Sequence, residues 1–466
     1  MKNHSQKTLF KKPLIFLLVM VGFFSCLKVI NYSGRHPGID FYQFWVVGKA
    51  VNQLDGENVY SEENRKKIGF YYFLESKHIY SQKINNGLKV SDKQIKAANF
   101  RKELETYSTP FLYTIFYFIT STCYDFDIQF FLVLSLVLYV YAFISLCRLL
   151  GYRVHTILVL IPVFTIFFRP FFSDIRVANV NQIQLALLIL FLCIQSRPSR
   201  LTNLAGGFVL GLSVMFKPNL VFVALMLVVS WVLNRRFEKL VLELMGISIA
   251  IIVAVTTSSL FFGSSLCWFQ WYEALIIIPN EILLVSMGNY SLSRLIFDFT
   301  DINVSKYFIF ALLLLTSYFV YRGRRKVVNI DLMKENNVYE QDLKAGFLED
   351  VATVSTGALI FLLSSSLVWL HYFILVIPAI IYIFRPENYL SQKNSIRKLI
   401  IVKRFLLAVA FLLVSNEPLL MLSSIIQVTP HFTAAAICSG TLIFYFLMLW
   451  ELKHIRRHLS PEFFNV

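Results

Sequence analysis

Several short polar stretches interrupt an otherwise apolar chain of 466 residues. The first holds Asp40, which follows the first apolar run within Gly38-Ile39-Asp40-Phe41-Tyr42. A carboxylate at the mouth of a membrane cavity could accept a proton from a sugar hydroxyl as a general base. The alternative is a helix N-cap, because Asp caps helices often and residues 41–51 read as a helix. On position alone, both interpretations are equally supported.

A second polar stretch runs from Asp174 to Gln182 and places one guanidinium beside three carboxamides. Arg176 could bind a phosphate through two parallel hydrogen bonds. Asn181 and Gln182 lie at the predicted membrane edge, where unpaired amides are costly. The alternative is helix capping combined with a salt bridge between Arg176 and Asp174. We favour the binding role.

Two isolated side chains, Lys217 and His371, stand between apolar runs. Lys217 either extends to the membrane surface or supplies positive charge to an anionic group in a cavity. His371 could donate a hydrogen bond to a phosphate or sugar, or act as an acid or base, although most such histidines only satisfy an interface. Both residues are therefore candidates for binding an anion.

A further polar stretch, Asn289 to Arg294, follows the aromatic residues 268–272 and reads on its own as a polar loop beside an aromatic belt.

The chain has no Gly-rich nucleotide loop, no HExxH or GxSxG motif and no Cys/His metal box. We therefore expect neither a metal nor a cofactor.

The composition predicts an all-α polytopic membrane protein. Hydrophobic residues make up 57% of the chain and charged residues only 15%, against about 25% charged in soluble domains. The net charge of +16 comes from Lys and Arg clusters between apolar runs, where positively charged cytoplasmic loops belong. This distribution argues against nucleic-acid binding.

The apolar runs and basic clusters together predict about 12 transmembrane helices (11–13), with both termini cytoplasmic. Segments 109–123 and 418–428 are ambiguous, and we treat the first as re-entrant or lying on the membrane surface. The expected spans lie near residues 12–31, 128–147, 154–169, 180–196, 203–216, 218–233, 242–262, 305–321, 352–368, 371–384, 398–415 and 432–452.

Four regions follow from this topology. Residues 1–31 form an N-terminal tail and first helix, and 32–127 form a long first extracytoplasmic loop with amphipathic or re-entrant helices. Residues 128–452 form the transmembrane helical domain, and 453–466 form a cytoplasmic tail. The topology uses only Lys/Arg bias, yet it collects the polar candidates on the extracytoplasmic side.

Six motifs, taken in order over about residues 10–385, resemble glycosyltransferase family 87. This is the DUF2029 group of polyprenol-phosphate-mannose-dependent mannosyltransferases in the GT-C superfamily. Three positions depart from the family pattern: Asn179 replaces a Gln, the Pro before Trp369 is missing, and Tyr372 replaces a second His. The motifs are Asp40-Phe41-Tyr42 with Trp45 and Gly48-Lys49-Ala50, Tyr107 with Pro110, Asn179-Val180-Asn181, Gly206-Gly207 with Phe216-Lys217-Pro218, Asn289-Tyr290-Ser291-Leu292 with Arg294, and Trp369-Leu370-His371-Tyr372.

The resemblance implies a GT-C-like fold in the cell (inner or plasma) membrane, with an extracytoplasmic active site. The implied reaction is inverting transfer of a hexose, with mannose expected, from a polyprenyl-phosphate-linked donor to a glycan or glycolipid acceptor. Asp40 would be the general base. The residues expected to bind the donor phosphate or sugar are Arg176, Asn179, Asn181, Lys217, Asn289, Arg294 and His371.

Three other functions remain open from the sequence. A secondary transporter or flippase of a lipid-linked or anionic substrate is the main alternative, and it predicts ionisable residues near the bilayer midplane. Another lipid-sugar enzyme, such as a polymerase or ligase of surface glycans, would use the large external loop differently. A non-catalytic scaffold would not need the Asp, Arg, Lys and His side chains on one side.

Overall fold

A computed structural model describes residues 11–51, 58–86, 91–121, 123–277, 280–324, 335–386, 394–416, 420–421 and 427–455. Within these ranges the chain is helical, and strand-like pairing is limited to an isolated bridge between Asn289 and Trp369. Most of the ambiguous segment 418–428 lies outside the described residues, as does nearly all of the predicted cytoplasmic tail.

The helices vary from single turns to a helix of thirty residues. In chain order they are α2 (Lys11–Ser33), α3 (Ile39–Ala50), α4 (Glu62–Asn85), α5 (Lys93–Phe100), α6 (Pro110–Tyr117), α7 (Tyr124–Leu149), α8 (Val154–Ile166), α9 (Arg169–Val177), α10 (Asn181–Gln195), α11 (Arg200–Phe216), η2 (Pro218–Leu220), α12 (Val221–Leu233), α13 (Phe237–Phe262), α14 (Cys267–Ile276), η3 (Asn280–Leu283), η4 (Val285–Met287), α15 (Leu292–Thr300), α16 (Ser305–Arg324), α17 (Glu335–Ser364), η5 (Leu370–Val376), α18 (Ile377–Ile383), α19 (Asn394–Ser415) and α21 (Pro430–His454).

Among the described residues, five helices are long and apolar enough to cross a membrane. They lie within α2, α7, α13, α17 and α21, and the bent pair α8–α9 would make a sixth. Outward-facing apolar side chains such as Leu260, which is 78% exposed, fit contact with lipid. The structure thus supports a multi-pass membrane protein, and the count of twelve spans stays a prediction.

Two stretches that the sequence placed between spans are helical in the structure. The expected external segment 170–179 is mostly helix α9, which bends by 57° from α8. Residues 335–350 were expected to lie in a polar loop, but they form the first part of α17. Each of these two helices buries an acidic side chain, Asp174 in α9 and Asp350 in α17.

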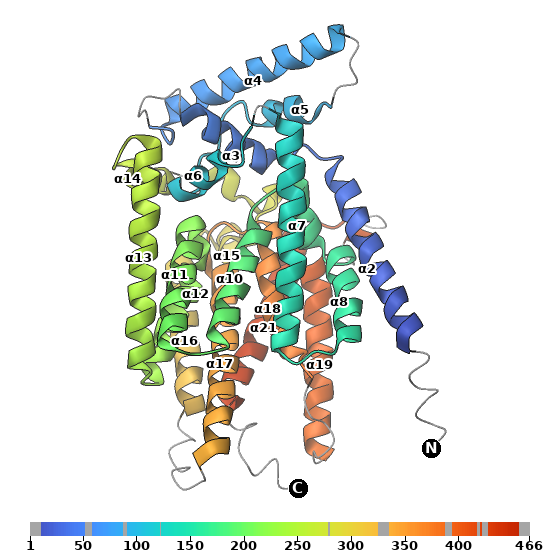
Figure 1. The fold of residues 1–466 in the computed structure, drawn as a ribbon, viewed down its shortest axis with the longest axis vertical. Coiled ribbons are helices and arrows are strands. Elements are labelled where there is room, and N and C mark those ends of the chain that lie inside the picture. Colours follow the sequence, from blue (N-terminus) through green and yellow to red (C-terminus); the bar gives the residue numbers. More distant parts are fainter. Residues whose placement is uncertain are drawn as a thin grey trace.

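Apart from α4, the long helices run roughly along one axis, and several short helices gather at one end (Figure 1). Helices α3, α5, α6 and α14 lie at the upper end of that view, with α4 across them, whereas α2 begins at the lower end.

Helix α6 has eight residues, far fewer than the roughly 20 that a span needs. It begins at an N-cap, Thr109, whose hydroxyl accepts from the Leu112 amide, and Pro110 fits the first helical position.

Helices α11 and α13 pack closely because glycines face the contact. A Cβ on Gly207 would collide with the backbone of Glu243, and one on Gly246 would collide with that of Leu204. Small residues allow helix backbones to approach in this way. The packing of α11 against α13 helps to fix Lys217, which is the C-cap residue of α11.

Replacing Gly207 with leucine is therefore expected to destabilise the protein by at least the roughly 1–3 kcal/mol typical of overpacking. Gly22→Leu is the matched control, because a Cβ there has open space within 4 Å. The measurement is the thermal unfolding of each purified variant in detergent. Equal midpoints for the two variants would contradict the close packing of α11 and α13.

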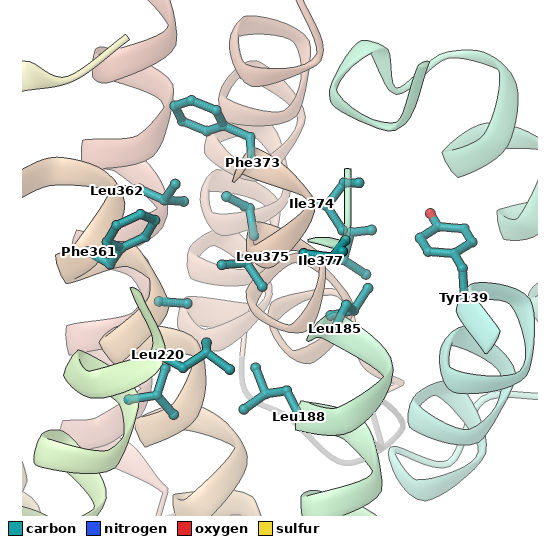
Figure 2. Packing of buried hydrophobic residues seen from close by; sticks show 14 of the residues in the cluster. Tyr139, Leu185, Leu188, Leu220, Phe361, Leu362, Phe373, Ile374, Leu375 and Ile377 are labelled. Atoms are coloured by element: carbon teal, nitrogen blue, oxygen red, sulfur yellow. The ribbon is translucent and has the colours of Figure 1, made fainter. Parts of the chain in front are cut away.

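A cluster of aliphatic and aromatic side chains lies behind the segment that follows α17. Figure 2 shows Phe373, Ile374 and Leu375 of η5 packed among side chains of α10, α17 and η2, including Leu185, Phe361 and Leu220. These three η5 side chains are fully buried. The packing fixes η5, which carries His371.

Three buried carboxylates away from the short helices, Glu349, Asp350 and Glu451, are paired with basic side chains. Where α12, α13 and α17 meet, Arg236 contacts Glu349 at 3.1 Å and Lys239 contacts Asp350 at 2.6 Å. Glu451 is 2.8 Å from Arg385. The basic residues that the charge bias placed in cytoplasmic loops therefore also neutralise buried carboxylates. An unpaired buried carboxylate would destabilise the fold.

Candidate functional site

A cavity of about 340 Å³ lies where the short helices meet the ends of the long ones. Its volume is in the range of small-molecule sites. Residues from α3, the α5–α6 segment, the α9–α10 and α11–η2 junctions, α14, α17 and η5 line it. The polar and charged residues of the lining are Asp40, Gln43, Arg101, Glu105, Tyr107, Ser108, Thr109, Asn179, Lys217, Asn219, Ser365, Ser366, Trp369, His371 and Tyr372.

Asp40 lies in the first turn of α3, next to the N-cap Gly38. Gly38 has a φ of 68°, and a Cβ there would collide with the side chain of Ile128. Because Gly38 is the N-cap and no side-chain cap bond is present, the N-cap interpretation of Asp40 is wrong. The carboxylate is free to face the cavity.

Both oxygens of Asp40 accept hydrogen bonds from other elements. Oδ1 accepts from Arg101 Nη2 at 3.1 Å, and Oδ2 accepts from Asn179 Nδ2 at 2.7 Å. Arg101 is 11% exposed at its side chain and also contacts Glu105 Oε1 at 2.7 Å. Burial opposes its charge, but Glu105 and Asp40 outweigh burial and raise the pKa of the guanidinium.

Lys217 is the cation beside Asp40 and caps the C-terminus of α11. Its Nζ donates to Asn179 Oδ1 at 2.9 Å and to Asn181 Oδ1 at 2.5 Å. The ring of Tyr372 lies 4.3 Å from the same nitrogen. Asn179 therefore joins Asp40 and Lys217 through the two ends of one carboxamide.

Asp174 is fully buried beside the network of Asp40, Asn179 and Lys217. Its oxygens accept from Asn181 Nδ2 at 2.8 Å and from Gln182 Nε2 at 3.1 Å. In the described part of the chain, the alternative salt bridge between Asp174 and Arg176 is not formed. Asp174 thus orients the amide of Asn181, whose oxygen accepts from Lys217.

His371 reaches the cavity from η5 and is 6% exposed. Its Nε2 has no hydrogen-bond partner among the described residues, and its ring contacts that of Tyr372, with centroids 4.8 Å apart. An unpartnered buried imidazole nitrogen can bind a group that enters the site.

Four of the predicted binding residues do not line the cavity. One of them, Asn181, still accepts a hydrogen bond from Lys217. Arg176 lies exposed on α9, in the turn before Asn179. Arg294 contacts Asp298 at 2.9 Å, and Asp298 lies 3.3 Å from His431. Asn289 is fully buried behind the segment that carries Trp369.

Asn289 connects two segments through four hydrogen bonds. Its Nδ2 donates to the carbonyl oxygens of Leu283 and Ser366, each at 2.8 Å, and its Oδ1 accepts from the amides of Ser291 and Val368. Three residues after Val368 the chain reaches His371. Asn289 therefore shapes the approach to His371 without touching the cavity.

We expect Asn289→Ala to destabilise the protein by several kcal/mol, because buried donors and acceptors would be left unpaired at about 1–3 kcal/mol each. Asn303→Ala is the control, since Asn303 is exposed and, among the described residues, its side chain accepts one hydrogen bond, from the Ser305 amide. Thermal unfolding measures both. A wild-type midpoint for Asn289→Ala would show that the four bonds carry little stability.

The sequence reasoning missed Arg101, Glu105 and Gln43. Arg101 and Glu105 belong to a stretch rich in Lys and Glu, which the sequence predicted to form amphipathic helices lying on the membrane. Arg101 contacts Asp40, about sixty residues earlier, and Glu105 contacts Arg101 and Gln43. No local sequence pattern marks these contacts. Among the described residues, no group of three or more His, Cys, Asp or Glu side chains gathers as a metal site.

Comparison with protein families matches residues 106–332 to the model of glycosyltransferase family 87. This confirms the resemblance noted in the sequence and covers Asn179, Asn181 and Lys217, whereas Asp40 and His371 lie outside the matched residues. Neither the curated proteins nor the solved structures contain a match.

Proposed function

Because residues 106–332 match glycosyltransferase family 87, which implies a membrane glycosyltransferase, we propose a specific reaction for the cavity. The protein transfers a hexose, with mannose the expected sugar, from a polyprenyl-phosphate-linked donor to an extracytoplasmic glycan or glycolipid. The transfer is a single displacement that inverts the anomeric carbon. The protein resides in the cell membrane with both termini cytoplasmic.

The observation that carries this proposal is the carboxamide of Asn179, which holds a carboxylate and an ammonium group on one cavity wall. Asp40 accepts from its Nδ2, and Lys217 donates to its Oδ1. A glycosyl transfer needs a base for the nucleophile and a cation for the leaving phosphate. A bridging amide keeps the two charges close without direct neutralisation.

In the proposed step, the acceptor hydroxyl oxygen bonds to the anomeric carbon while the bond between that carbon and the phosphate oxygen breaks. Asp40 takes the hydroxyl proton. The leaving lipid phosphate keeps the electron pair, and Lys217 stabilises its growing charge, with His371 Nε2 as a further donor when protonated at that nitrogen. We assign exposed Arg176 to guiding the donor phosphate toward the cavity.

The apolar part of the lining supports a lipid-linked donor. Phe216, Phe222, Phe361 and Leu275 contribute to it, on α11, α12, α17 and α14. An apolar surface next to a charged one matches a ligand with a hydrocarbon chain and a phosphate. The chain also lacks nucleotide-binding motifs.

The donor can be tested with membranes that contain or lack the protein. We expect labelled hexose to reach a membrane product from a polyprenyl-phosphate hexose, and not from a nucleotide sugar when lipid-donor synthesis is blocked. Movement of the intact lipid donor across the membrane, without a new glycosidic bond, would instead favour the flippase function.

The proposed sidedness has its own test. Reporter fusions after residue 125 and after residue 240 should report opposite sides, with the first extracytoplasmic and the second cytoplasmic. Residue 125 lies at the start of α7 and 240 at the start of α13, and these starts lie at opposite ends of the bundle (Figure 1). An extracytoplasmic reporter at 240 would contradict the topology.

A further inference from the structure

Glu105 is a cavity carboxylate that the proposed reaction does not use. It lies between α5 and α6 and lines the cavity. Its Oε1 contacts Arg101 Nη1 at 2.7 Å, and its backbone amide donates to Gln43 Oε1 at 2.9 Å. These contacts fix its position, yet 42% of its side chain stays exposed. Such a carboxylate is available to a ligand.

Asp40 and Glu105 are held by the same guanidinium. Nη2 of Arg101 contacts Asp40 and Nη1 contacts Glu105. Because a guanidinium is planar and its nitrogens have a fixed separation, Arg101 sets the spacing of the two carboxylates. Asn179 restrains Asp40 from the other side. The pair therefore presents two hydrogen-bond acceptors at a short, fixed distance.

Two such acceptors complement two hydroxyl groups on neighbouring carbons of a sugar, since each hydroxyl has one proton to donate. Within the described residues, Glu105 Oε2 has no contact of its own. A phosphate would be repelled by both carboxylates, so the donor phosphate belongs on the Lys217 side. The acceptor then occupies the side built by Arg101 and Glu105.

We propose that Glu105 binds a hydroxyl of the acceptor sugar adjacent to the hydroxyl that Asp40 deprotonates. This inference rests on the proposed function and narrows the acceptor to a sugar or polyol with two neighbouring free hydroxyl groups. Arg101 acts as a positioning residue for both carboxylates.

The test compares wild type, Glu105→Gln and the control Glu103→Gln in the full-length purified protein. Glu103 is 50% exposed, 4.0 Å from Arg65, and does not line the cavity. The acceptor is supplied as dilutions of a native membrane fraction that lacks the protein. Two rates are measured from labelled polyprenyl-phosphate hexose: transfer to membrane product and release of free hexose to water.

For Glu105→Gln we expect the apparent acceptor KM to rise about tenfold or more, from the lost hydrogen bond to a charged group, while donor hydrolysis is unchanged. Glu103→Gln should match wild type. An unchanged acceptor KM would overturn the inference. An equal fall in transfer and hydrolysis would also overturn it, because it would show that Glu105 only supports Asp40. Asp40→Asn, which should lose both rates, tests the proposed function separately.

Discussion

Replacing Asp40 with asparagine is expected to lower sugar transfer by about 10²–10⁴-fold, the contribution of a general base. Asparagine can still accept a hydrogen bond from Arg101 through its amide oxygen, but it cannot accept the proton of the nucleophile. The measurement is incorporation of labelled hexose from the polyprenyl-phosphate donor, at equal amounts of folded protein.

Asp298→Asn is the matched control. Asp298 also contacts an arginine, Arg294 at 2.9 Å, and its side chain is 13% exposed, against 16% for Asp40. It does not line the cavity. If both variants lost transfer to the same extent, loss of an ion pair would explain the Asp40 result, and the base would have to be another residue.

The second large effect is expected for Lys217→Met. Removing one group that stabilises charge in a transition state costs about 10²–10³-fold in rate. Lys217 is the lining cation that Asn179 joins to Asp40. Transfer from the lipid donor is again the measurement. Lys102→Met provides the control, because Lys102 is exposed and stands over the Phe73 ring.

A structural role for Lys217 must be separated from a catalytic one. Lys217 interacts electrostatically with buried Asp174, so its loss leaves that charge uncompensated and lowers stability. In the double variant Lys217→Met, Asp174→Asn, the uncompensated charge is gone. We expect this variant to regain thermal stability without regaining transfer. Recovery of both would show that Lys217 serves folding alone.

The helical membrane class could be predicted from the sequence because burial in lipid imposes long apolar runs. The positions of Asp40, Asn179, Asn181, Lys217 and His371 could be predicted as well, since polar groups among apolar residues are costly and stand out. The structure brings these side chains to one network or to the lining of one cavity.

Contacts between distant segments could not be predicted. Arg294 belongs to one of the six sequence motifs, yet its guanidinium forms an ion pair with Asp298, one helical turn later, and does not line the cavity. Arg101 looks like any other charge of its loop until the fold brings it to Asp40. Reading by charge also placed residues 170–179 and 335–350 between spans. The structure shows helix there, and it buries Asp174 and Asp350.

The most direct test of the central claim is a single turnover of polyprenyl-phosphate hexose by the purified protein, with the anomeric configuration of the product determined by NMR. Wild type is predicted to give a product inverted relative to the donor, and Asp40→Asn to give almost none in the same time. A product of retained configuration, or full transfer by Asp40→Asn, would contradict direct displacement with Asp40 as the base.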